Sequence, residues 1–206
     1  MVMSVMLLHN LKILGAIVGL FGLLLAAFSL LRNLQRARSE LAVRLLYDWA
    51  RDLNWETARA LDLAVALHSD GQESKALQDI YNKKPVSIPS QYYNDVMIML
   101  RNGFSVENMP CPPGQGNETF RISREHSTLI RFLWASWLNR LEGVLSAWLQ
   151  AVANQELMER EFSKYVKSVG PELKALHFLL EGTPAVRAFY KHISEKDDVE
   201  RRRPLG

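Results

Sequence analysis

The chain has 206 residues, a formal net charge of +3 and one cysteine. This length accommodates one ordinary domain plus a terminal segment. A single cysteine excludes an internal disulfide and a zinc site built from cysteines. Acidic and basic residues alternate along most of the sequence, whereas a nucleic-acid binder gathers its cations on one face. Nucleic acid is therefore not an expected partner.

Residues 13–31 form an apolar run in which Ser29 is the only polar side chain. As a helix this run is about 28 Å long, which matches the hydrocarbon core of a bilayer. We therefore predict a transmembrane helix over residues 13–31, preceded by a short extracytoplasmic N-terminus over residues 1–12. A cleaved signal peptide is the alternative, but its apolar core is usually shorter and ends at a small-residue cleavage site.

Small residues recur within this run at spacings of four, three, four and three positions, so they share one stripe of a helix. Such a stripe lets two helix backbones approach closely in lipid. The stripe predicts self-association, and hence a homo-oligomer, through Gly15, Gly19, Gly22, Ala26 and Ser29.

A basic joint over residues 32–38 follows the apolar run. Arg32, Arg36 and Arg38 in this joint are expected to contact the surface of the lipid bilayer. Only Lys12 flanks the other end of the run, so the excess of cations predicts that the C-terminal side faces the cytoplasm.

Residues 39–195 are predicted to form an all-α cytoplasmic domain of about six or seven helices, followed by a charged tail over residues 196–206. Apolar periodicity and glycine, proline and asparagine signals set the boundaries of these helices. Residues 119–122 resemble a strand but are assigned as coil, because no partner strand is evident. The expected helices cover residues 41–53 and 55–68, either as two helices or as one bent helix, and then residues 73–82, 90–102, 123–153, 155–169, 172–181 and 184–193.

The helix over residues 123–153 is the strongest of these elements. Its tryptophans follow a helical apolar spacing and are expected to pack in the core. A second membrane span is the alternative, but Arg131, Arg140 and Glu142 argue against it, because charges near the centre of a bilayer are costly.

No catalytic, cofactor-binding or metal-binding constellation is recognisable in the sequence. None of the histidines has the spacing of a metal-binding pair. Glu125 and His126 are adjacent, but neighbouring residues on a helix point about 100° apart and do not share a face. Asn139 and Glu142 do share a face, and they are expected either to pair with an arginine such as Arg131 or to face water.

The motif that begins Leu138-Asn139-Arg140-Leu141-Glu142-Gly143 and continues with residues 154–157 and Phe162 resembles a bacterial family known only as a domain of unknown function. Members of that family have one N-terminal transmembrane helix and a helical cytoplasmic domain with an L-N-x-x-E signature. The resemblance implies a bacterial inner-membrane protein, but it implies no chemistry, and residues 104–118 do not align.

Three functions agree with these observations. The first is a membrane-anchored, non-enzymatic interaction, scaffold or signalling protein that binds a protein partner through its cytoplasmic domain and self-associates through its anchor. The second is a membrane-tethered effector of a defence or toxin system. The third is a hydrolase whose site is assembled from residues that are distant in the sequence.

Overall fold

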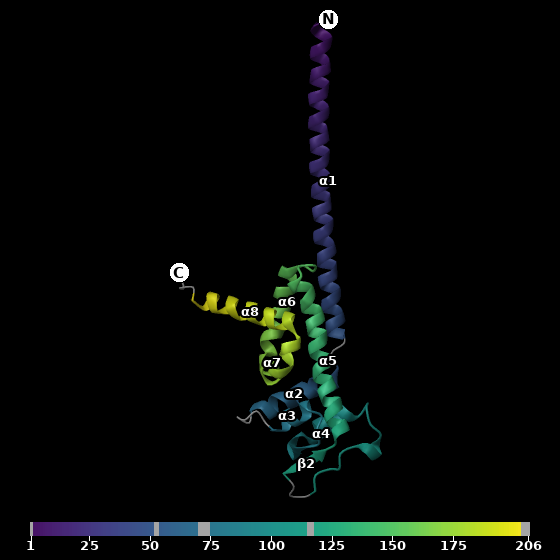
Figure 1. Ribbon diagram of the computed structural model, residues 1–206, viewed down its shortest axis with the longest axis vertical. Coiled ribbons are helices and arrows are strands. Elements are labelled where there is room, and N and C mark those ends of the chain that lie inside the picture. The colour runs from purple at the N-terminus through teal and green to yellow at the C-terminus, as the bar shows by residue number, and fades with distance from the viewer. Residues whose placement is uncertain (1, 52–53, 70–74, 115–117, 203–206) are drawn as a thin grey trace.

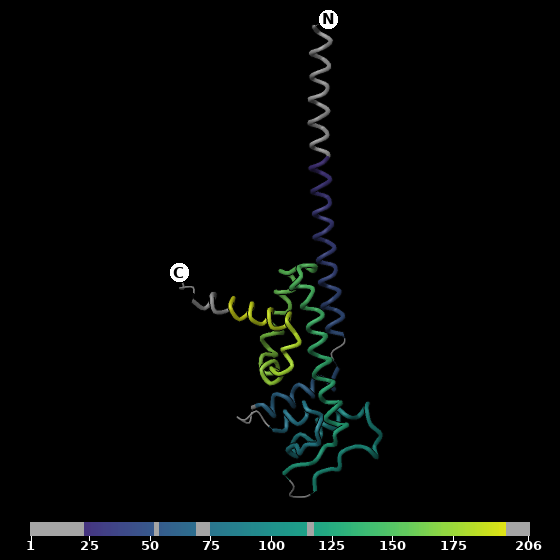
Figure 2. The backbone as a smooth tube through the Cα atoms, viewed as in Figure 1, coloured from purple at the N-terminus to yellow at the C-terminus, as the bar shows by residue number. Residues whose placement is uncertain are grey.

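The computed structural model describes the backbone over residues 2–51, 54–69, 75–114 and 118–202, and side chains within residues 23–51, 54–68, 75–114 and 118–196 (Figures 1 and 2). The chain is mostly helical, at 79%, which confirms the predicted all-α class. The α-helices are α1 (Val2–Arg51), α2 (Trp55–Ser69), α3 (Lys75–Tyr81), α4 (Tyr93–Leu100), α5 (Arg124–Leu149), α6 (Gln155–Ser168), α7 (Gly170–Ala175) and α8 (Pro184–Arg202).

The predicted membrane topology, with a transmembrane helix over residues 13–31, is wrong. The structure describes side chains of the predicted span only from Leu23 onward, so residues 13–22 lie outside the described side chains. Charged residues occur along α1 from Arg32 onward. Within the part of the chain that the structure describes, no helix has both the length and the hydropathy needed to cross a bilayer. This finding contradicts the predicted single-pass transmembrane helix and, with it, the predicted inner-membrane location.

Helix α5 is the central element of the helical body, because it contacts α1, α2, α3, α4 and α8. The helix begins after Ser123, whose hydroxyl accepts a hydrogen bond from the backbone N–H of His126. Its tryptophans Trp134, Trp137 and Trp148 are buried, as their spacing predicted. The indole of Trp134 also donates to the backbone oxygen of Ala60 on α2, at 2.7 Å.

A two-stranded antiparallel sheet contradicts the assignment of residues 119–122 as coil. Strand β2 (Thr119–Ile122) pairs with β1 (Val86–Pro89), with Val86 opposite Ile122 and Pro89 opposite Thr119. Each strand buries alternate residues against the body, which is the pattern of a half-buried sheet. Neither four-residue strand is long enough for alternation to mark it in the sequence, so the pairing emerges only in the tertiary structure.

Several helices differ from their predicted boundaries. Residues 90–102 divide into a 3-10 turn, η1 (Ser90–Tyr92), and the shorter α4. Residues 172–181 divide in the same way between α7 and η3 (His177–Gly182), whereas α8 continues beyond the predicted end at residue 193. A further 3-10 turn, η2 (Val106–Asn108), lies in the loop before β2. Helix α6 agrees with the prediction, because Asn154 caps it through Leu157.

Glu142 has a different role from the one expected. Its two carboxylate oxygens accept hydrogen bonds from the backbone N–H groups of Ala185 and Val186, each at 3.0 Å. These donors belong to the first turn of α8, so Glu142 attaches α5 to the positive end of that helix. Arg131 lies instead over the ring of Tyr81, 5.1 Å from its centroid.

Candidate binding site

Two features of α1 distinguish it from an ordinary core helix. The first is a set of large apolar side chains that remain exposed where α1 extends beyond the body (Figure 1). Monomeric proteins rarely expose a contiguous apolar patch of this kind unless it binds something. The exposed side chains are Leu23, Leu24, Leu25, Phe28, Leu30, Leu31 and Leu34.

Part of this apolar set follows a heptad pattern, which we call the α1 seam. Its members are spaced four, three, four, three and four residues apart, and this spacing places them along one line of a helix that can pack against a second helix. The exposed fraction falls from 71% at the first leucine to 36% at the last, where α1 reaches the body. The α1 seam consists of Leu23, Ala27, Leu30, Leu34, Ala37 and Leu41.

The α1 seam does not face the body. Ala42 is fully buried against the body, and Leu41 precedes it by one residue, so the two side chains point about 100° apart around the helix. Trp49, further along the buried face, contacts the ring of Phe162 in a tilted arrangement and the ring of Tyr165 edge-to-face, both on α6. A second helix can therefore approach the α1 seam without displacing the packing between α1 and α6.

The small-residue stripe predicted from sequence lies on a different side of α1. Gly15, Gly19 and Gly22 lie outside the residues whose side chains the structure describes. Ala26 and Ser29 are exposed, and Ser29 is displaced from Leu30 of the seam by about 100°. Self-association through this stripe thus stays a prediction.

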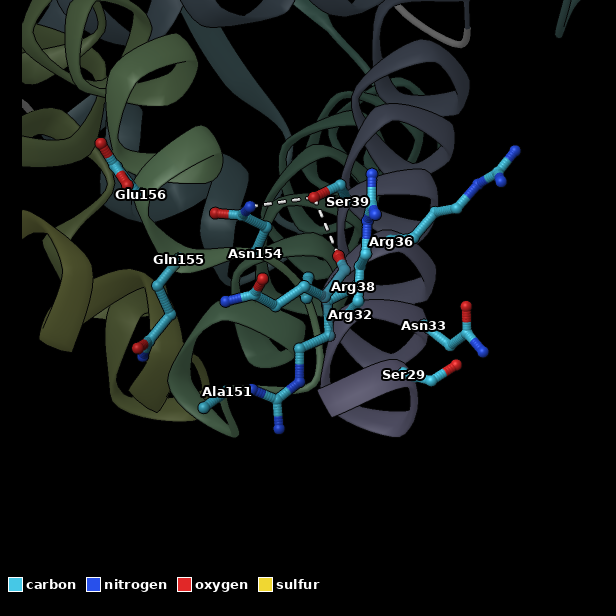
Figure 3. A pocket seen from close by; sticks show the side chains of 12 residues that line it. Ser29, Arg32, Asn33, Arg36, Arg38, Ser39, Ala151, Asn154, Gln155 and Glu156 are labelled. Atoms are coloured by element: carbon cyan, nitrogen blue, oxygen red, sulfur yellow. Dashed lines mark hydrogen bonds between the residues drawn. The ribbon is translucent and has the colours of Figure 1, made fainter. Parts of the chain in front are cut away.

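The second feature is a groove of about 900 Å³ between α1 and the turn that joins α5 to α6 (Figure 3). All three arginines that were expected at a membrane surface line it. We call it the basic groove and define it by Ser29, Arg32, Asn33, Gln35, Arg36, Arg38 and Ser39 on α1, together with Ala151, Ala153, Asn154, Gln155 and Glu156.

Hydrogen bonds hold the two walls of the basic groove together. The backbone N–H of Asn154 donates to the backbone oxygen of Arg38 at 3.1 Å. Its side-chain amide donates to the hydroxyl of Ser39 at 3.0 Å, and that hydroxyl donates to the backbone oxygen of Gln35. Because Asn154 also caps α6, the groove is fixed to the start of that helix.

The arginines of the basic groove differ in their environment. Arg36 forms an ion pair with Glu40 at 2.9 Å, and Figure 3 shows its side chain pointing away from α6. Arg32 extends toward Ala151 on the opposite wall (Figure 3). Neither Arg32 nor Arg38 has an ion-pair partner among the described residues. The groove therefore offers two guanidinium groups that can bind an anion.

A separate polar cluster joins α6 to α8. The carboxylate of Glu159 accepts a hydrogen bond from the indole of Trp148, and lies 3.2 Å from both the Nε2 atom of His192 and the ammonium of Lys196. Burial raises the pKa of Glu159, but the hydrogen bonds from Trp148, His192 and Lys196 outweigh that effect and the net shift is downward. Since the carboxylate is surrounded by three partners, its role is to connect helices.

Glu172 in the first turn of α7 lies in an unfavourable position. One of its carboxylate oxygens is buried without a hydrogen-bond partner among the described residues. Burial, and then the negative charge of Asp62, raise the pKa of Glu172 above its usual value, although a backbone hydrogen bond partly opposes them. The folded state therefore holds this proton more tightly than the unfolded chain does.

We expect the Glu172→Gln variant to be more stable than the natural chain at neutral pH. With a raised pKa, the stabilising contribution of Glu172 is complete below the unfolded pKa of 4.5 and is lost as pH rises through the folded pKa. Solvent screens this half-exposed group, so the gain should be about 0.5 kcal/mol, or about 1–2 °C in Tm.

Thermal unfolding of both proteins at pH 4 and pH 7 measures this effect. The exposed Glu107→Gln variant is the matched control and should show no gain at either pH. An equal gain for Glu172→Gln at both pH values would contradict an electrostatic origin.

The remaining candidate side chains from the sequence are Cys111 and His126. No group of three or more histidine, cysteine, aspartate or glutamate side chains within it has the geometry to hold a metal ion. Cys111 is exposed in the proline-rich loop. His126 is buried, accepts a hydrogen bond from the backbone N–H of Ser123, and lies 2.7 Å from the backbone oxygen of Asn108, which are structural roles.

Sequence reasoning identified one wall of the basic groove and missed the other. Arg32, Arg36 and Arg38 were selected for their charge, but the residues opposite them are more than a hundred positions away in the chain. The cap formed by Asn154 was the only signal on that wall.

Comparisons of the chain with models of protein families, with curated proteins and with solved structures found no match, so the resemblance to a bacterial family rests on its sequence motif alone.

Proposed function

We propose that this protein is a non-enzymatic helical interaction protein that assembles with further copies of itself through the α1 seam. The observation that carries the proposal is the row of exposed leucines on α1 beyond the body. Helices form coiled coils through leucines in a heptad pattern, because each of these side chains inserts between four side chains of the facing helix.

The choice of a second copy as the partner rests on the pattern itself. A heptad seam is complementary to an identical seam, since the same positions supply both the inserted side chains and the holes. The charged residues between Leu23 and Leu41, which are Arg32, Arg36, Arg38 and Glu40, do not belong to the α1 seam. Pairing therefore buries leucine and alanine side chains and leaves these charges in water.

The test is the mass of the purified full-length protein in solution, measured by light scattering. We expect the natural chain to have at least twice the protomer mass of 23.5 kDa, and the Leu30→Glu/Leu34→Glu double variant to have the protomer mass. Two carboxylates in each copy would face two in the other within an apolar contact, which is strongly unfavourable.

Val43→Glu is the matched control. Val43 is also an exposed apolar residue of α1, but it lies outside the α1 seam, so this variant should assemble like the natural chain. A natural chain with the protomer mass, or a double variant that assembles normally, would overturn the proposal.

A further inference from the structure

We infer that the basic groove binds a small anion that carries several phosphate groups. Three arginines line it against one glutamate, and the charge of Arg36 is already compensated by Glu40 outside the groove. Figure 3 places Glu156 on the α6 wall, away from the arginines. The uncompensated positive charge therefore belongs to Arg32 and Arg38.

The spacing of these two arginines favours a chain of phosphates over a single one. Arg32 and Arg38 are six residues apart on α1, which separates their backbone positions by about 9 Å along the helix axis and their side-chain directions by about 120° around it. Guanidinium groups bind phosphate oxygens in a planar, two-point geometry, and each prefers its own phosphate group. A linear polyphosphate can satisfy both arginines at once.

Neutral polar side chains surround the arginines and provide a second kind of recognition. Asn33 and Gln35 line the α1 wall, and Gln155 lines the other. The side-chain nitrogen of Gln155 donates to the backbone oxygen of Trp148 at 3.0 Å, which leaves its carbonyl oxygen able to accept. The volume of about 900 Å³ lies within the range of small-molecule sites and exceeds what a phosphate chain alone requires.

The groove is also held in shape before any ligand binds. Asn154 joins its two walls through the hydrogen bonds to Arg38 and Ser39, so binding does not require the walls to be brought together. A site that is already formed loses less conformational freedom on binding. Arg32 lies on the far side of α1 from the α1 seam, and Arg38 lies at the border of the seam, about 40° from Leu34, so the inference does not require the proposed self-association.

Calorimetric titration of the full-length protein with sodium tripolyphosphate, and separately with ATP, tests the inference at fixed ionic strength without divalent cations. We expect both probes to bind, and the Arg32→Gln/Arg38→Gln double variant to bind tripolyphosphate about tenfold or more weakly. Tighter binding of ATP identifies a nucleotide as the source of the phosphates, whereas equal binding identifies the inorganic chain; both results support the inference.

Arg44→Gln is the matched control, because Arg44 is an exposed arginine of α1 outside the basic groove and 4.0 Å from Asp48. The affinity of the Arg44→Gln variant for tripolyphosphate should differ from that of the natural chain by less than about twofold, because salt screens an exposed charge outside the groove. Leu30→Glu/Leu34→Glu should bind tripolyphosphate like the natural chain, which separates this test from that of self-association. The inference would be overturned if the natural chain gave no heat of binding with either probe, or if the double variant and Arg44→Gln lost equal affinity for tripolyphosphate. It would also be overturned if a hexaglutamate peptide bound more tightly than tripolyphosphate.

Discussion

Replacing Trp134 with alanine should lower the free energy of unfolding by about 3–5 kcal/mol, the range for truncating a buried aromatic side chain. Trp134 is 0% exposed at the centre of α5, and its indole reaches across to α2. The substitution therefore leaves a cavity between two helices and removes the hydrogen bond that the indole donates to the backbone oxygen of Ala60. Urea unfolding followed by circular dichroism measures the loss.

Trp134→Phe separates the two contributions and remains informative if the alanine variant does not fold. Phenylalanine keeps most of the apolar contact but cannot donate, so the loss should be about 0.5–1.5 kcal/mol, the net contribution of one hydrogen bond, because the backbone oxygen of Ala60 keeps its donor within α2. Phe132→Ala is the matched control on the same helix, because Phe132 is 62% exposed and its loss should stay below about 1 kcal/mol. Equal losses at Phe132 and Trp134 would show that α5 is not packed as described.

The second large effect is expected at Glu142. Replacement by alanine removes both acceptors for Ala185 and Val186 and the negative charge at the start of α8. Hydrogen bonds to charged groups contribute about 1.5–3 kcal/mol each, and water that enters the space left by the half-buried side chain would replace part of them, so the total loss should be about 2–3 kcal/mol. Amide hydrogen exchange should accelerate first at Ala185 and Val186.

Asn139→Ala is the control for this experiment, because Asn139 shares the sequence motif with Glu142 but is exposed. Its effect should be within about 0.5 kcal/mol. Glu142→Gln keeps one acceptor without the charge and should fall between the two. If exchange at Ala185 stays slow in Glu142→Ala, the attachment of α8 does not depend on this carboxylate.

Local signals in the sequence were sufficient for much of the helical architecture. Asn154 marks a helix start because its side chain accepts a hydrogen bond from the first turn, and the structure has this cap. The tryptophans of α5 are buried because their spacing follows one helix face. Each of these predictions depends on residues within about one or two turns of each other.

Contacts between distant residues could not be predicted in the same way. The pairing of Val86 with Ile122 needs two segments that are separated by a proline-rich loop. Glu142 was recognised as a notable residue, but its donors in α8 lie more than forty positions away. The predicted membrane span is contradicted because no helix among the described residues is long and apolar enough to cross a bilayer, and α1 continues past residue 31 into a charged segment.

The continuity of α1 also affects how two copies would be arranged. No glycine or proline occurs between Leu23 and Arg51, and an uninterrupted helix behaves as a stiff rod over this length. A contact between two copies along the leucine-rich half of α1 would therefore also fix the orientation of the two bodies, because α1 has no hinge within this length. In an assembled pair the two grooves would open at a set separation, and a bridging ligand that matches this separation would gain from a high effective concentration.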